Sequence, residues 1–226
     1  MAVAVDGASS SSIAASLTLS WTSHIVGGAD RLICVGSSIA DLVSEATGVT
    51  FAGTALTQVT GSPVTNGFEA SMWRLIAPIT GAQTVVITVD VATDIVGGEV
   101  SFTDVDQTTP LGTWAEATGT SDAPSVTVTS ATDDIVIAVI ASDATQAPVP
   151  GADQTERWDV DGGIVNGEGS TEPGAASVVM SATLAIVGLW AIGGVSVKAA
   201  GAAAGHPTMR RWEHVPHMTF HGRMAA

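Results

Sequence analysis

Cysteine, aromatic residues and charged side chains are all scarce in this chain of 226 residues. The single cysteine, Cys34, allows no intrachain disulfide, so a disulfide-stapled scaffold is excluded. It lies in an apolar, strand-like run, which favours a buried and unreactive thiol. Aromatic residues are 4% of the chain and tyrosine is absent, which argues against a sugar-cleaving site with aromatic platforms. Charged residues are 13%, so Ser, Thr, Asn, Gln and Gly must keep the surface soluble, as in displayed β-proteins.

The chain also lacks a long hydrophobic run. Its most apolar stretch, residues 182–197, is 16 residues long and is broken by three glycines, whereas a spanning helix needs about 20 residues. The first residues have neither a basic region nor a long apolar run, so we expect no signal peptide. The sequence therefore predicts no membrane partner.

Basic residues are few, and they are distributed unevenly. Residues 1–198 hold 21 Asp and Glu against four Lys and Arg, a net charge of −17. Residues 199–226 hold three arginines against Glu213, a net charge of +2. An acidic body repels polyanions, so nucleic acid is not expected as a partner.

Short β-type runs followed by turn residues recur through the acidic part of the chain. Leu17, Leu19 and Trp21 alternate with polar residues, which predicts one buried and one exposed face. Residues 134–141 are apolar on both faces and should form a central strand. We expect about ten or eleven strands in all. The further runs are 31–38, 49–52, 55–59, 68–76, 84–91, 96–103, 125–129, 154–160, 176–183 and 185–198.

The helical signal is weak, because only residues 39–46 could form a turn or two of helix. No alternation of helices and strands indicates a parallel sheet. The sequence therefore predicts an all-β fold, an antiparallel β-sandwich of jelly-roll or immunoglobulin-like order, with an extended C-terminal arm. The expected divisions are a sandwich domain at 1–198, a small-residue linker at 199–205 and the arm at 206–226.

Catalytic constellations are missing from the predicted body. Its one histidine, His24, follows a strand-like run without a nucleophile elbow of the form Gly-x-Ser-x-Gly. Paired carboxylates are numerous, so their presence is weak support for hydrolase chemistry. We expect no enzymatic activity and no organic cofactor.

One acidic loop is a candidate calcium site. Asp159, Asp161 and Glu168 place carboxylate oxygens around a glycine-rich turn, and calcium prefers oxygen ligands. The spacing does not match an EF-hand, and Asp and Gly are also ordinary turn formers. Calcium and a simple turn both remain open for this loop.

The last 21 residues differ in composition from everything before them. They hold four of the five histidines and three of the six methionines, together with Trp212 and Phe220. Disorder and a metal site at His214, His217 and His221 are alternatives. We favour a docking arm, because Trp, Phe, Met and Arg are typical of binding hot spots and not of solvated tails. Its expected contact residues are Met209, Arg210, Arg211, Trp212, Val215, Met218, Phe220 and Arg223.

Several segments of the body together resemble a loosely characterised family of β-sandwich domains. These domains occur in tailed-bacteriophage structural proteins and in bacterial surface proteins. The similarity spans about residues 15–198, and its most specific part is Val-Asp-Gln-Thr-Thr-Pro-Leu-Gly at 105–112. The other segments are 17–20, 30–36, 49–57, 100–104, 154–158 and 190–197.

The resemblance implies a structural role in a virion and carries no catalytic residues with it. We therefore expect a capsid decoration or cement protein that contacts the major capsid protein, other virion proteins and further copies of itself. The alternatives are a tail or baseplate receptor module that binds glycan, and a bacterial surface adhesin domain. Exposure of Trp114 or Trp158 would favour the glycan-binding alternative.

Overall fold

The computed structural model describes residues 1–25, 27–40, 44–143 and 148–201, and the regular elements in these ranges are all β-strands. The ladders between named strands are antiparallel, which confirms the predicted all-β, antiparallel class. The described residues form sixteen strands, more than expected, partly because four of the strands have only two residues.

The strands are β1 (Ala4–Ile25), β2 (Leu32–Ala40), β3 (Ala46–Phe51), β4 (Thr54–Ala55), β5 (Thr57–Gln58), β6 (Val64–Thr65), β7 (Phe68–Ile76), β8 (Gly81–Thr103), β9 (Ala115–Ser121), β10 (Ser125–Val128), β11 (Ile135–Ser142), β12 (Val149–Pro150), β13 (Thr155–Asp161), β14 (Asn166–Pro173), β15 (Val178–Thr183) and β16 (Gly188–Val197).

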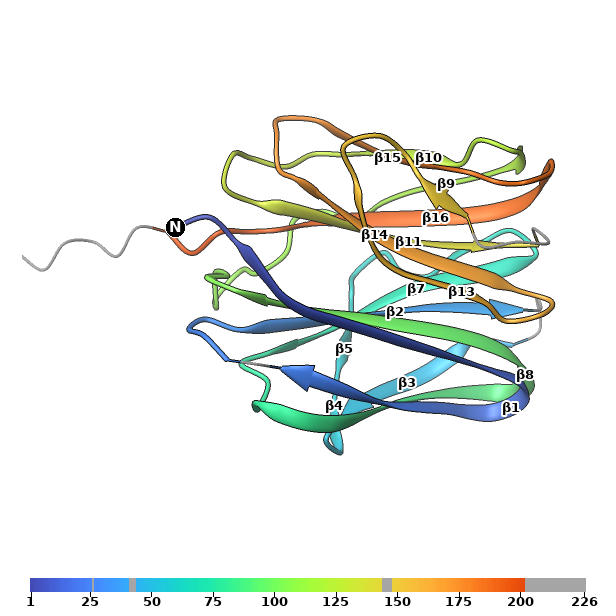
Figure 1. Ribbon diagram of the computed structural model, residues 1–226, viewed down its shortest axis with the longest axis horizontal. Coiled ribbons are helices and arrows are strands. Elements are labelled where there is room, and N and C mark those ends of the chain that lie inside the picture. Colours follow the sequence, from blue (N-terminus) through green and yellow to red (C-terminus); the bar gives the residue numbers. More distant parts are fainter. Residues whose placement is uncertain (26, 41–43, 144–147, 202–226) are drawn as a thin grey trace, which may run out of the picture.

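The first half of the chain forms one strongly curved sheet of eight strands around the long β1–β8 pair (Figure 1). Strand β8 pairs with β3 before a bend and with β2 after it, so the two predicted runs 84–91 and 96–103 form one continuous strand. The path β4-β3-β8-β2-β7-β5 nearly closes, because Leu56 alone separates β4 from β5. The result is a barrel-like sheet.

The interior of this sheet confirms most of the predicted alternation. Leu19 and Trp21 of β1 pack inside against Val85, Ile87 and other apolar side chains, which we call the barrel core. Leu17 was predicted on the same face, but it is 52% exposed. The reason is a β-bulge between Ser16 and Thr18, which changes the face on which the preceding side chains lie.

The second half of the chain forms a five-stranded sheet, β13-β14-β11-β16-β9, and a three-stranded sheet, β10-β15-β12. Strand β11 is central and buried, as predicted for residues 134–141. A second cluster of buried side chains, the outer core, packs between these two sheets and includes Ile140 and Met180. Strand β14 was not predicted, because Asn-Gly-Glu-Gly-Ser-Thr-Glu-Pro shows no alternation, yet its first six residues are buried.

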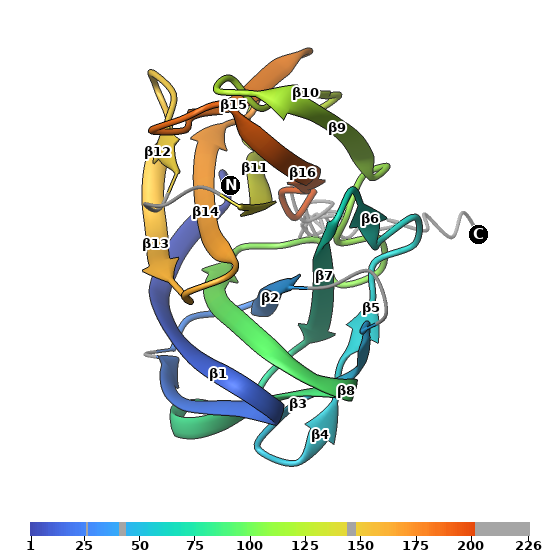
Figure 2. The ribbon, with the colours of Figure 1, turned by 90° about the vertical axis from the view of Figure 1, so that its right-hand side faces the viewer.

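Another cluster of buried side chains, the inter-sheet core, joins the two halves. Figure 2 shows the sheets that it connects, with β2, β7 and β8 on one side and β11, β14 and β16 on the other. It brings Phe102 of β8 and Met72 of β7 together with Val139 of β11 and Val195 of β16. The central strands of both large sheets are therefore covered on both faces. Burial on both faces explains why polar residues such as Ser101 and Ser196 are also buried.

Trp158 of β13 is one of the two tryptophans of the inter-sheet core, and glycines make room for it. A Cβ atom on Gly98 of β8 or on Gly169 of β14 would overlap its indole ring. A Cβ atom on Gly36 of β2 would lie 2.9 Å from the same ring. Glycine is therefore required on three strands of two different sheets, where one tryptophan lies against the backbone.

Candidate functional site

The eight predicted contact residues of the arm lie outside the described residues, so their role stays a prediction. They are Met209, Arg210, Arg211, Trp212, Val215, Met218, Phe220 and Arg223. The structure does describe the segment that precedes them, residues 198–201, which we call the exit point.

This exit point is held by main-chain hydrogen bonds on both sides. Lys198 donates to Pro110 O at 2.8 Å and accepts from the N–H of Asp106 at 2.9 Å. Ala199 donates to Asp134 Oδ1 at 2.9 Å, and Ala200 donates to Asp104 O at 2.8 Å. The segment after β16 is therefore fixed to the loop that contains the 105–112 motif.

The exit point lies at the same end of the body as the N-terminus (Figure 1), where Val3 donates to Asp133 O at 2.8 Å. Acidic side chains gather around it. The main-chain N–H groups of Thr109 and Thr108 donate to Asp106, and they hold its pKa below the ordinary range. The aspartates at this end are Asp30, Asp104, Asp106, Asp133 and Asp134.

The structure does not assemble the predicted calcium site. Asp159 faces Glu168 across the β13–β14 ladder, but Asp159 is exposed and Glu168 is fully buried. Asp161 is also exposed, and its Oδ1 accepts from the N–H of Gly163 at 2.9 Å, as in an ordinary turn. The described residues hold no group of three His, Cys, Asp or Glu side chains arranged for a metal ion. Calcium therefore gains no support.

Three buried carboxyl groups are the chemical feature that the sequence reasoning missed. Glu69, Glu99 and Glu168 are at most 2% exposed, and each lies on a strand within a sheet. The pKa of Glu69 is raised, mainly because burial disfavours the ionised form. A glutamate directly after a glycine, as in Gly98-Glu99 and Gly167-Glu168, is the available signal for two of them.

Glu99 points into the barrel core and takes part in a small network of hydrogen bonds. Its Oε1 accepts from Ser23 Oγ at 2.6 Å and from Ser9 Oγ at 3.0 Å. Trp21 Nε1 in turn donates to Ser9 Oγ at 3.0 Å. Burial raises the pKa of Glu99 to about 7, although both hydroxyl groups act to lower it.

Glu168 lies in the second half of the molecule and has fewer partners. The adjacent Ser170 Oγ donates to Gln154 Oε1 at 2.9 Å, and both oxygens of Glu168 lack a hydrogen bond among the described residues. Burial, together with the like charges of Glu156 and Asp159, raises its pKa to about 8, although the nearby Ser170 hydroxyl, which forms no hydrogen bond of standard geometry with it, acts to lower the pKa. Both Glu99 and Glu168 are thus protonated in weakly acidic solution.

Cys34, Trp114 and Trp158, which the sequence analysis singled out, are buried side chains that pack in the interior. Cys34 is fully buried, as expected, and burial raises the pKa of its thiol to about 12. Trp114 and Trp158 are 9% and 4% exposed, which counts against their use as platforms for glycan. The main chain of His24 belongs to β1.

The part of the chain that the structure describes contains no helix long and apolar enough to cross a membrane. Comparison with protein families, with curated proteins and with solved structures finds no match for this chain.

Proposed function

We propose that this chain is a non-enzymatic structural protein of a tailed-bacteriophage virion, a capsid decoration protein attached through its C-terminal arm. The single observation that carries the proposal is the fixed exit point. A body whose last strand is held on both sides presents the following 25 residues, 202–226, from a defined place. A defined origin favours docking, because it limits the volume that the arm must search.

Composition adds a second line of support. The arm combines apolar anchors with a net charge of +2 for residues 199–226, whereas residues 1–198 carry −17. Burying each large apolar anchor contributes roughly 1.5–3 kcal/mol before ordering costs. Twenty-one extended residues reach at most about 70 Å, enough to cross onto a neighbouring subunit.

The resemblance in the body supplies the biological setting. The 105–112 motif, its most specific part, forms the loop against which the exit segment is fixed. The proposed partners are the major capsid protein, other virion proteins and further copies of this chain. The sandwich with jelly-roll or immunoglobulin-like order remains part of this proposal.

Removal of residues 206–226 tests the proposal directly. The expected result is loss of attachment to particles that lack the protein, with an unchanged midpoint of thermal unfolding for the body. A finer test replaces Trp212 and Phe220 by Ala, with Thr208 and Thr219 replaced by Ala as the matched control. Unchanged occupancy of the truncated protein on particles would contradict attachment through the arm.

The alternative roles remain distinguishable. A glycan array with the isolated protein tests the receptor module, against which the burial of Trp114 and Trp158 already counts. A surface adhesin would have to reach the cell exterior, which fractionation of expressing cells would reveal.

A further inference from the structure

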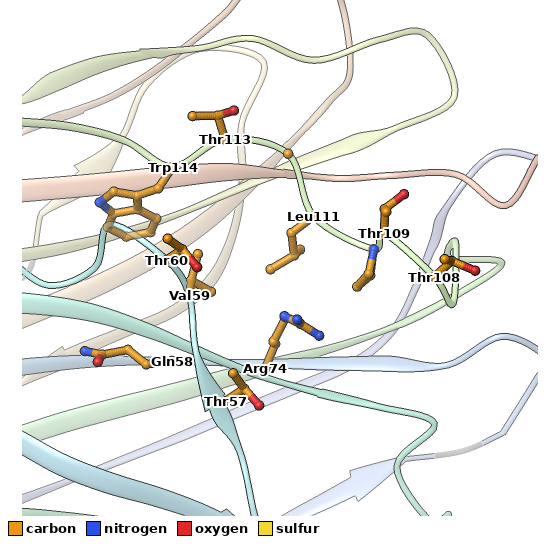
Figure 3. A pocket seen from close by; sticks show the side chains of 12 residues that line it. Thr57, Gln58, Val59, Thr60, Arg74, Thr108, Thr109, Leu111, Thr113 and Trp114 are labelled. Atoms are coloured by element: carbon orange, nitrogen blue, oxygen red, sulfur yellow. The ribbon is translucent and has the colours of Figure 1, made fainter.

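A surface pocket lies where the two halves of the body meet, close to the 105–112 motif. It has a volume of about 420 Å³ and is lined by β5, the following residues Val59 and Thr60, Arg74 of β7, and the segment 108–114 (Figure 3). The segments 57–60 and 108–114 are far apart in sequence, so the pocket exists only in the folded molecule.

Arg74 is the one charged side chain of this pocket. It is half-buried, and in Figure 3 its side chain extends from β7 toward Thr109 and Leu111. No hydrogen bond or ion pair of its guanidinium is found among the described residues. By contrast, Arg31 donates to Pro78 O at 3.0 Å, and Arg157 donates to Thr171 Oγ1 at 2.7 Å.

The rest of the lining is polar but uncharged. Five threonines and one glutamine supply hydroxyl and amide groups, whereas Leu111, Pro110 and Trp114 supply apolar surface. None of the lining residues is acidic, although residues 1–198 contain 21 Asp and Glu. A guanidinium with no hydrogen-bond partner among the described residues, in a pocket lined by no carboxylate, is suited to an anionic ligand.

We propose that this pocket binds a small hydroxylated carboxylate of the sugar-acid class. A single guanidinium matches one carboxylate through two parallel hydrogen bonds. A phosphate dianion would bring twice the negative charge to a body of net charge −17, with one arginine to offset it. The threonine hydroxyls and the Gln58 amide suit the hydroxyl groups of such a ligand, and the volume lies within the range of small-molecule sites.

This inference does not rest on the arm. The pocket is formed entirely by residues of the body, and recognition through Arg74 requires no aromatic platform. Attachment to particles and binding of a sugar acid are measured separately, so either can fail without the other.

Titration calorimetry of the full chain with sodium D-glucuronate tests the inference, with D-glucose and inorganic phosphate as comparison ligands. We expect saturable binding of glucuronate at millimolar concentration and at least tenfold weaker binding of both comparison ligands. Arg74→Gln should weaken glucuronate binding at least tenfold. Arg157→Gln, which removes the same charge elsewhere, should leave it within about twofold.

A second variant covers the case in which Arg74→Gln does not fold, as judged by circular dichroism. Thr57→Val, on the strand that pairs with β7 at Arg74, keeps the charge and the shape but removes a hydroxyl, and it should weaken glucuronate binding about threefold or more while leaving acetate binding unchanged. Three results would overturn the proposal: no saturable binding of glucuronate, equal affinity for glucose or phosphate, or an equal loss in the Arg157→Gln control.

Discussion

Glu99 and Glu168 occupy comparable positions in the two halves of the molecule, but their surroundings differ. Each lies on a buried strand next to a glycine that packs against Trp158, namely Gly98 and Gly169. Glu99 accepts two hydrogen bonds from serines, whereas Glu168 accepts none from the described residues. The pKa of Glu99 is raised to about 7 and that of Glu168 to about 8.

The comparison shows that burial determines the direction of the pKa shift, and that hydroxyl donors limit the size of that shift. Hydrogen bonds to the ionised form favour ionisation and offset part of the cost of desolvation. Because both groups hold a proton more tightly in the folded state, the linkage acts in the direction opposite to that of a paired carboxylate.

The largest expected effect comes from the side chain that separates the two glutamates. Trp158→Ala should lower the free energy of unfolding by about 3–5 kcal/mol, because it leaves a cavity against Gly36, Gly98 and Gly169. Chemical denaturation measures the loss, and Trp212→Ala in the arm serves as a control without effect on the body. A decrease in the free energy of unfolding below about 1 kcal/mol would show that Trp158 contributes little to the packing of β8 against β14.

The second prediction concerns pH. Below about pH 4.5, the ordinary value of a glutamate, both carboxyls are protonated in the folded and the unfolded chain. As the pH rises from about 4.5 toward 7 for Glu99 and toward 8 for Glu168, the unfolded chain loses these protons while the folded chain retains them, so the free energy of unfolding falls. The decrease levels off once the folded chain also loses them.

Glu168→Gln and Glu99→Gln should remove this loss. At pH 9 we expect Glu168→Gln to be more stable than the unsubstituted protein by on the order of 2–4 kcal/mol, since one pKa unit corresponds to about 1.4 kcal/mol. Glu99→Gln should gain less, and near pH 4.5 both differences should nearly vanish. Denaturation curves from pH 4 to 9 measure this, and a larger gain for Glu99→Gln would reverse the comparison.

The smallest expected effect comes from removing one of the serine hydroxyl groups that donate to Glu99. Ser23→Ala removes the 2.6 Å hydrogen bond to Glu99 and should cost about 1–2 kcal/mol. It should also raise the pKa of Glu99 toward that of Glu168. Ser142→Ala is the matched control, because the hydroxyl of Ser142 has no hydrogen-bond partner among the described residues. Equal costs for the two variants would mean that the donor is unimportant.

Alternation in the sequence was a good guide where a strand has one buried face, and a poor guide elsewhere. It predicted Phe68–Ile76 with the observed bounds and the inward face at Val85, Ile87 and Val89. It missed β14, whose glycines and polar residues are buried between layers, and the first half of β1. Coverage on both faces arises from the stacking of sheets, which no local pattern contains.

The buried glutamates and the Arg74 pocket were harder to predict than the strands, because they depend on contacts between segments that are distant in sequence. Ser9 and Ser23 reach Glu99 from positions 90 and 76 residues away, so the sequence could not predict their hydrogen bonds. The pocket around Arg74 likewise needs segments 57–60 and 108–114 to meet. The pairing of Trp158 with its three glycines is also absent from any local motif.

The shared location of the N-terminus and the exit point has a practical consequence for display of foreign peptides. In Figure 1 both lie at one end of the long axis, whereas the β13–β14 turn and the bend of β1–β8 lie at the other end. A guest peptide joined to Met1 would lie beside the proposed attachment surface, but one inserted between Gly162 and Gly163 would project away from it. The β13–β14 turn is therefore a suitable position for inserting a foreign peptide.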